Sequence, residues 1–296
     1  MNRDSPFYWH ILLLVVIVSA LAVLIMIGNK MFTESLRSPT AEAIKHKLAL
    51  ESKGLEDLHF DLVDPGEAPE PLRALVRQGF HLMTQTQVYA PDYVGDKMSC
   101  SNCHFGGGNT TGGDKSGISL AGVAAKYPNY MSREQKVLAL SDRINLCFVN
   151  SMHGKPLPVE SQEMLALITY LHWISKDFPI YRIAPWLGLK PLSVSQIQDP
   201  ERGKALYEEK CASCHGMNGA GENTTPPIPP VWGQESFTVE AGMSDLKTLS
   251  SFIYWNMPYN DPSLTMEEAW DVAAYLTEQE RPGHTKTVSG RFRDNL

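Results

Sequence analysis

Four of the five cysteines in this chain of 296 residues lie in two short motifs of the form CxxCH. The first runs from Cys100 to His104, and the second runs from Cys211 to His215. Two thiols at this spacing can each bond one vinyl group of the same porphyrin, and the adjacent imidazole can bind the iron. The motifs therefore predict two covalently bound haem c groups. The predicted attachment residues are Cys100, Cys103, Cys211 and Cys214, and the first iron ligands are His104 and His215.

Paired cysteines at this spacing have three other common uses: a zinc site, a pair of disulfides, or a thioredoxin-like dithiol. A single zinc ion shared by both copies is disfavoured, because Cys211 follows Cys100 by 111 positions. In addition, a histidine directly follows each copy. The haem interpretation is favoured because CxxCH is among the most specific short motifs.

The composition limits the functions and the number of domains to be considered. The formal net charge of −7 gives no indication of nucleic-acid binding, and no Gly-rich phosphate-binding loop occurs in the sequence. Hydrophobic residues make up 43% of the chain, which is enough to build hydrophobic cores. A chain of this length forms roughly one to three domains.

The first thirty residues differ from the rest. From Tyr8 to Gly28 the chain is apolar except for His10 and Ser19, and this length suits a helix that crosses a bilayer. A cleaved signal peptide is the alternative, since residues 20–22 have an AxA form; this triplet, however, lies inside a run longer than the usual apolar region of a signal peptide. We therefore expect a retained anchor. Haem c attachment takes place outside the cytoplasm, so we expect the globular part in the periplasm.

Helical patterns flank each CxxCH motif in the same order. In the second copy a helix is predicted to begin at Asp199 and run to Cys211, and a Thr265-capped helix is predicted to close the copy near Leu276. In the first copy the corresponding patterns span residues 72–83 and 161–174. Both copies resemble class I cytochrome c domains, in which the two terminal helices cross at a glycine and pack against an aromatic residue.

We therefore expect a mainly α fold with two class I cytochrome c-type domains in tandem behind an N-terminal transmembrane helix. The predicted parts are an anchor at residues 1–30, a polar tether at 31–66, a first cytochrome c domain at 67–175, a proline-containing linker at 176–198, and a second cytochrome c domain with a C-terminal tail at 199–296.

The second haem needs a further ligand on the face opposite His215. Met257 lies in the loop before the final helix, where class I cytochromes present a thioether that raises the reduction potential. Met243 and Met266 are alternatives that we interpret as packing residues. The carbonyl of Pro229 or Pro230 is expected to accept the proton of the His215 imidazole, as in related cytochromes.

The first haem has an unusual candidate ligand in Cys147, the cysteine that neither motif uses. It has three possible roles: a buried inert thiol, an intermolecular disulfide, or a thiolate bound to iron. Position favours the third role, because Cys147 follows His104 by 43 residues and Met257 follows His215 by 42. Met152 and His153 are close enough in the sequence to be rival ligands.

Polar residues around Cys147 suggest an anion site. Arg143 and Ser151 lie four residues before and after it, so on a helix all three share one face. Arg133 is about 21 Å away on an unbroken helix. However, Ser132 with Gln135 resembles a capping box and Ser141 with Asp142 a second helix start, so a turn near Leu140 can return Arg133 to the haem edge. A surface ion pair is the alternative for Arg133.

These features together resemble the dihaem thiosulfate dehydrogenase family, relatives of the SoxA cytochromes. The resemblance rests on the CSNCH motif, on the pattern RINxCFxxSMxGKPLP that begins at Arg143, and on the His/Met domain that follows. It implies that His104 and Cys147 ligate an active-site haem and that a second haem passes electrons on. It also implies catalytic roles for Arg133, Arg143 and Ser151. The chain departs from the family pattern at Asn150 and His153, and an anchor is not general among members.

The resemblance implies that two thiosulfate ions are oxidised to tetrathionate, with the arginines binding sulfonate oxygens and Cys147 carrying an S-thiosulfonate adduct. Electrons would leave through the second haem to a soluble cytochrome or another periplasmic acceptor. Tetrathionate reduction is the possible reverse reaction. The alternative from another class is a non-catalytic, membrane-anchored electron carrier, in which Met152 could ligate the first haem. Peroxidase activity, a third possibility, requires an open site at one iron and is less favoured.

Overall fold

The protein is described here by a computed structural model. It describes residues 62–95, 97–194 and 196–283, together with Val18, Ser19, Leu21, Val23 and Met26. The chain divides into two compact units, Met1–Lys53 and Gly54–Leu296, and the fold below belongs to the second. Among the described residues, no helix has both the length and the apolar character needed to cross a membrane. The predicted transmembrane segment lies outside the described residues, apart from the five single positions.

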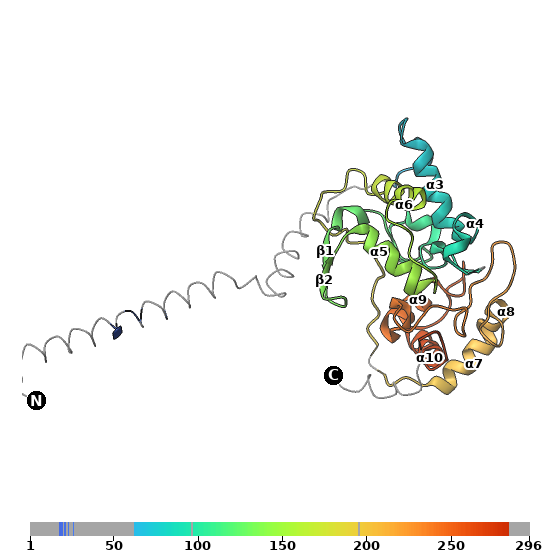
Figure 1. The fold of residues 1–296 in the computed structure, drawn as a ribbon. Coiled ribbons are helices and arrows are strands. Elements are labelled where there is room, and N and C mark those ends of the chain that lie inside the picture. The colour runs from blue at the N-terminus through green and yellow to red at the C-terminus, as the bar shows by residue number, and fades with distance from the viewer. Residues whose placement is uncertain are drawn as a thin grey trace, which may run out of the picture. The chain divides into compact units, whose positions relative to one another are not determined.

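The first cytochrome c domain is organised by two crossing helices, α3 (Arg73–Thr84) and α6 (Gln162–Trp173) (Figure 1). They cross at Gly79, where a Cβ atom would collide with the carbonyl oxygen of Ala166 and with Tyr170. The Tyr170 ring packs 5.9 Å from that of Phe80, and its hydroxyl donates to the carbonyl of Gly107 at 3.1 Å. The expected crossing at a glycine against an aromatic residue is therefore present in this domain.

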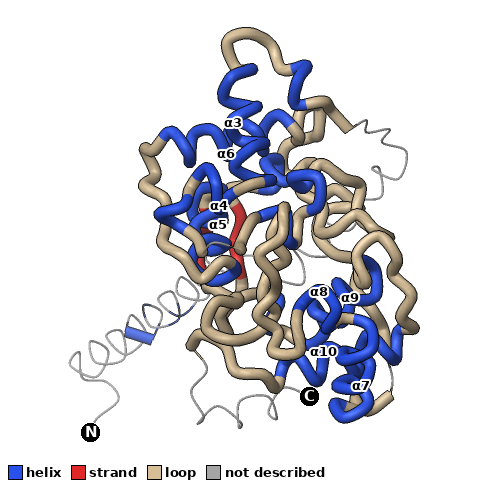
Figure 2. Tube along the Cα trace, turned by 90° about the vertical axis from the view of Figure 1, so that its right-hand side faces the viewer, coloured by secondary structure: helices blue, strands red, loops and turns tan. Residues whose placement is uncertain are grey.

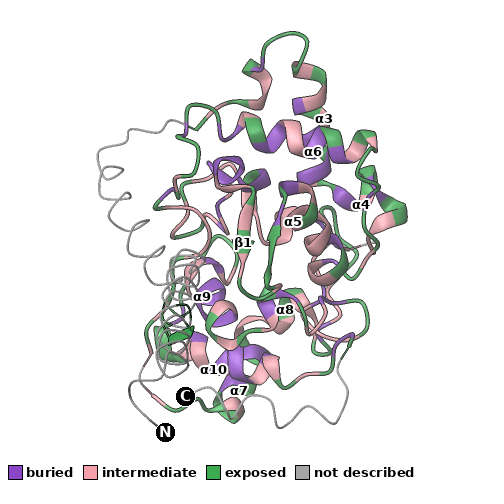
Figure 3. Cartoon of the chain, turned by 60° about the vertical axis from the view of Figure 1, so that its left-hand side comes forward, coloured by how far each residue is buried: buried purple, intermediate pink, exposed green. Residues whose placement is uncertain are grey.

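The second domain repeats this plan with α7 (Pro200–Lys210) and α10 (Met266–Thr277), and α9 (Leu246–Asn256) packs against α10. Here Gly203 is the crossing point, since its Cβ would meet the carbonyl of Asp271. The predicted starts of both terminal helices are confirmed, because the side chains of Asp199 and Thr265 cap them. Buried residues concentrate on α6, α9 and α10 (Figure 3).

A hairpin and a short helix lie between the first attachment motif and α6. The hairpin pairs β1 (Asn129–Met131) with β2 (Lys136–Leu138), and α5 (Leu140–Leu146) follows directly (Figure 2). The capping box expected at Ser132 and Gln135 is wrong, because these residues form the hairpin turn and Gln135 has a φ of 52°. The helix start expected near Ser141 is confirmed: the carboxylate of Asp142 accepts from the backbone N–H of Ala139 at 2.9 Å.

The remaining helical elements are short. They are 3₁₀ turns at Pro65–Glu67, Pro91–Tyr93, Cys100–Asn102, Phe105–Gly108, Val123–Lys126 and Gly242–Ser244, the short helices α4 (Thr86–Tyr89) and α8 (Ala212–His215), and a π-helical turn at Cys147–Ser151. Two of these, Cys100–Asn102 and α8, carry the attachment motifs.

Candidate active site

The first attachment motif forms a tight turn that fixes its histidine. Ser99 precedes the turn, and its backbone N–H donates to the Asn102 side chain at 2.6 Å. The Nδ1 atom of His104 lies 2.8 Å from the carbonyl oxygen of Ile118. Because a carbonyl only accepts, Nδ1 carries the proton and Nε2 keeps its lone pair for a metal. The carbonyl of Ile118 was not anticipated from the sequence, which has no proline run at this point.

The second motif has the same arrangement. The Nδ1 atom of His215 lies 3.0 Å from the carbonyl oxygen of Pro229, which confirms the expected proline carbonyl. Burial lowers the pKa of His215, so the imidazole is held in the neutral form that binds iron.

The donor set at each motif fits a covalently attached haem. All five cysteines are free, so both thiols of each CxxC pair are available for thioether bonds. Burial raises the pKa of Cys100 and of Cys103 to about 12, and the Cys147 sulfur contributes to both shifts. Cys147 therefore lies close to the first attachment pair.

Cys147 is positioned by the junction between α5 and the π-helical turn that it begins. The Nη1 atom of Arg143 lies 2.8 Å from the Cys147 Sγ atom. Burial alone would raise the pKa of Cys147, but the charges and hydrogen bonds of Arg143 and His104 lower it from 9.0 to about 7. The junction therefore brings the spare sulfur, the proximal imidazole and one guanidinium together and favours the thiolate.

Two further side chains approach Arg143, and sequence reasoning missed both. Tyr127 and Arg143 form a side-chain hydrogen bond, which lowers the pKa of the phenol, although burial raises it overall. Burial lowers the pKa of Lys126, and the nearby positive charge of Arg143 lowers it further. The sequence offers no signal for either residue, because the turn at Val123–Lys126 lies well before α5 in the chain. Arg143, which contacts Cys147, thus has a second cation, Lys126, within electrostatic reach.

Arg133 lies in the hairpin turn. Its Nη2 atom is 3.3 Å from Oε2 of Glu240 in the second domain, and its side chain is 51% exposed. The structure therefore gives Arg133 the ion pair that was its alternative role, and it is not among the groups that shift the pKa of Cys147.

The other residues of the segment also have defined places. Ser151 ends the π-helical turn. Met152 is 4% exposed and belongs to the hydrophobic core of the first domain, while His153 Nδ1 lies 3.0 Å from the carbonyl of Gln234. The backbone N–H of Thr238 donates to the carbonyl of Asn150 at 2.9 Å. This segment thus contacts the second domain through its backbone and His153.

Met257 directly follows α9 and is its C-cap. It is partly buried and packs against the core of the second domain. Met243 is buried in that core, and Met266 begins α10 with 41% of its surface exposed.

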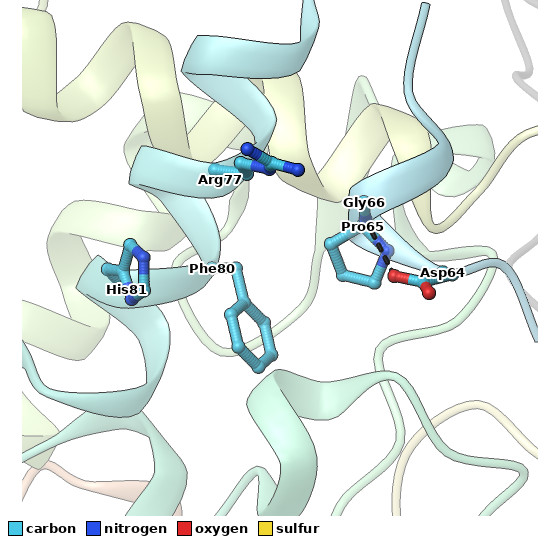
Figure 4. Close-up of a pocket in the computed structure, with 6 residues that line it drawn as sticks. All are labelled: Asp64, Pro65, Gly66, Arg77, Phe80 and His81. Carbon is cyan, nitrogen blue, oxygen red and sulfur yellow. Dashed lines mark hydrogen bonds between the residues drawn. The ribbon is translucent and has the colours of Figure 1, made fainter.

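A hollow also lies on the first domain (Figure 4). It lies between α3 and the turn at Pro65–Glu67, and its lining residues are Asp64, Pro65, Gly66, Arg77, Phe80 and His81. It includes none of the predicted site residues.

Two tandem domains, each with crossing terminal helices and a CxxCH turn whose imidazole is fixed by a carbonyl, define a dihaem c-type cytochrome. Comparison with known families agrees: residues 87–180 match the SoxA/TsdA cytochrome c domain, and residues 198–276 match the cbb3-type cytochrome c oxidase subunit III family.

Curated relatives identify the family. The chain is 37% identical to the thiosulfate dehydrogenase of Thiomonas intermedia over 75% of this chain and 72% of the relative. It is 31% identical to the thiosulfate dehydrogenase of Allochromatium vinosum over 83% of this chain and 93% of the relative. The chain therefore belongs to the dihaem thiosulfate dehydrogenase family of oxidoreductases and carries two covalently bound haem c groups.

A solved structure is also similar. The thiosulfate dehydrogenase (TsdBA) of Marichromatium purpuratum superposes with a TM-score of 0.72 at 30% identity and covers 83% of this chain. This chain spans 55% of the length of that longer chain.

Proposed function

We propose that this chain oxidises two thiosulfate ions to one tetrathionate at the first haem and passes the two electrons out through the second. His104 and Cys147 would ligate the first iron, and His215 and Met257 the second. When bound, the haems accept and transfer single electrons. The names and identities of the relatives support the substrate, and the site geometry supports the roles below.

The observation that carries the proposal is the contact between Arg143 and Cys147. The Cys147 sulfur lies 2.8 Å from a guanidinium, and Arg143 and His104 lower its pKa to about 7, which favours the thiolate. A protein that only carries electrons has no use for such a reactive thiolate. Met152, the rival ligand, belongs to the hydrophobic core, which supports its role as a packing residue.

Substrate binding is an electrostatic problem, because thiosulfate is a dianion and two must approach each other. Arg143 would bind sulfonate oxygens through its planar fork, and Lys126 would add positive charge from the neighbouring turn. Ser151 would donate a further hydrogen bond. Arg133, in the exposed hairpin turn, would add positive charge without contacting the sulfur.

The chemistry on Cys147 balances without a proton. The thiolate and the terminal sulfur of one thiosulfate form an S–S bond as two electrons leave, which gives an S-thiosulfonate on Cys147. The terminal sulfur of a second thiosulfate attacks the adduct sulfur that is bonded to Cys147. The bond to Cys147 breaks, tetrathionate is released and the thiolate is regenerated. The exchange step is a thiol–disulfide reaction and runs in both directions, so tetrathionate reduction is the reverse activity.

Membrane attachment is part of the proposal. The apolar run from Tyr8 to Gly28 would anchor the chain, with both haem domains in the periplasm and a soluble cytochrome or other periplasmic acceptor taking the electrons. In fractionated cells, the full chain should stay with the membranes after a salt wash and leave them only in detergent. A mature N-terminus after Ala22, found by mass spectrometry, would instead establish a cleaved signal peptide.

The central test compares Cys147→Ala with Met152→Leu in the full-length haem-loaded protein. Cys147→Ala should abolish thiosulfate-dependent reduction of ferricyanide and remove the low-spin thiolate signal in electron paramagnetic resonance. Met152→Leu conserves volume and should keep both. Turnover that persists in Cys147→Ala would exclude Cys147 from the reaction. Absence of thiosulfate turnover in the wild type, together with a low-spin signal that survives Cys147→Ala and changes in Met152→Leu, would assign the chain to the electron carriers.

A further inference from the structure

Two segments, one from each domain, are hydrogen-bonded to each other. The backbone N–H of Lys115 donates to the carbonyl of Trp255 at 2.9 Å, and that of Gly117 donates to Oδ1 of Asn256 at 2.7 Å. The second bond is buried, and Asn256 is 0% exposed. A buried bond between domains does not compete with water, so it fixes geometry more firmly than a surface contact.

The first segment leads directly to the proximal ligand of the first haem. Ile118 follows Gly117, and its carbonyl holds the Nδ1 atom of His104 at 2.8 Å. Its N–H bonds back to the carbonyl of Cys103 at 2.8 Å. Gly117 is itself tightly enclosed, since a Cβ atom there would lie 2.8 Å from the Phe105 side chain. Displacement of Gly117 must therefore move the carbonyl that orients the imidazole.

The second segment leads directly to the ligand of the second haem. Met257 follows Asn256, and its N–H donates to the carbonyl of Ile253 at 2.8 Å. The Asn256 amide donates back to the carbonyl of Phe252 at 3.1 Å, so both ends of this side chain are used. Aromatic rings reinforce the junction: Phe105 lies edge-on to Phe252 at 5.9 Å and to Tyr259 at 5.2 Å.

We propose that the Asn256 side chain is a positioning group shared by both haem sites. On one side it fixes the backbone that leads into Met257, and on the other it fixes the backbone that leads into Ile118. The hydrogen bond to a ligating imidazole controls its orientation and basicity, and so the potential of the metal. One amide therefore couples the ligand geometry of the two sites. This inference rests on the proposed ligation by His104 and Met257.

A purely structural role for Asn256 makes a different prediction. If the amide only caps α9, its loss would weaken the second domain and leave the first haem unchanged. A signal from the first haem, which lies in the other domain, therefore distinguishes the two roles.

The experiment uses the full-length dihaem protein and three variants. Asn256→Leu keeps the size of the side chain and removes both hydrogen bonds. Asn256→Asp keeps an acceptor oxygen for the Gly117 N–H, loses the amide donor to Phe252 and introduces a titratable carboxyl group. Ser250→Ala is the matched control, since Ser250 is also 0% exposed on α9 but bonds within its own helix, to Lys247.

In Asn256→Leu we expect a weaker methionine-to-iron absorption band at the second haem, together with changed g-values at the first haem and shifted midpoint potentials at both. In Asn256→Asp and Ser250→Ala the g-values of the first haem should match those of the wild type. If Asn256→Leu does not accumulate with both haems, Asn256→Ala removes the same acceptor and takes its place.

The coupling is wrong if the acceptor-lacking variant alters only the second haem, or if Asn256→Asp disturbs the first haem equally. Failure of the proposed ligation is recognised separately, in proteins that keep Asn256. It would appear as a first-haem signal unaffected by Cys147→Ala, or as the absence of the methionine band before any change at Asn256.

Discussion

The guanidinium of Arg143 and the sulfur of Cys147 are in direct contact, with 2.8 Å between Nη1 and Sγ across one turn of backbone. Arg143 is half-buried, and the largest influence on its pKa is the Cys147 sulfur, which raises it. The charge of Arg143 in turn lowers the pKa of the Cys147 thiol. Each group thus stabilises the charged form of the other in a partly buried site.

Replacement of Arg143 should impair turnover strongly. We expect Arg143→Ala to lower kcat/KM for thiosulfate by about 100-fold, the usual scale for loss of one charge-stabilising donor. Arg143→Lys should fall between wild type and Arg143→Ala, because it keeps the charge but loses the planar fork. Steady-state kinetics measure both. Arg77→Ala, at the exposed hollow of Figure 4, is the control and should behave as wild type.

Lys126 should act on substrate binding more than on chemistry. Its pKa is lowered partly by the positive charge of Arg143, and a bound dianion would relieve that repulsion. We therefore expect Lys126→Gln to raise KM for thiosulfate several-fold while kcat changes little. Lys136→Gln, on the exposed strand β2, should leave both constants unchanged. An unchanged KM in Lys126→Gln, or an equal rise of KM in Lys136→Gln, would show that Lys126 has no specific role in substrate binding.

The ion pair of Arg133 and Glu240 predicts opposite effects of its two partners. Glu240→Gln releases the guanidinium and should lower KM for thiosulfate, whereas Arg133→Ala should raise it. Both changes should shrink as salt is added, because exposed charges are screened. The melting temperature should hardly move, since an exposed pair contributes only about 0–1 kcal/mol. Identical KM values in both variants would show that Arg133 does not contribute to thiosulfate binding.

Close helix crossing makes Gly203 intolerant of any side chain. In Gly203→Ala the new methyl group must displace the carbonyl of Asp271, so we expect a loss of about 1–3 kcal/mol in the free energy of unfolding. Gly242→Ala is the matched control, because its Cβ meets nothing within 4 Å. Urea titration of both variants gives the comparison. A stability for Gly203→Ala equal to that of the control would mean that the helices can separate without cost.

The sequence alone was sufficient where covalent spacing or local capping sets the answer. The CxxCH motifs specify two attached haems because two thiols at this spacing reach the vinyl groups of one porphyrin and the adjacent imidazole reaches its iron. Asp199 and Thr265 fix helix starts through their own backbone neighbours, and Pro229 follows His215 closely enough for its carbonyl to be anticipated.

Tertiary structure decided the contacts between residues far apart in the chain. The hairpin replaced the helix expected at Ser132, because pairing of β1 with β2 satisfies more backbone groups than an isolated cap. The partner of Arg133, the approach of Lys126 to Arg143, and the bond from Gly117 to Asn256 depend on how separate segments pack. No local pattern encodes such packing, since each contact gains its energy only after the chain has brought both partners together and excluded water from between them.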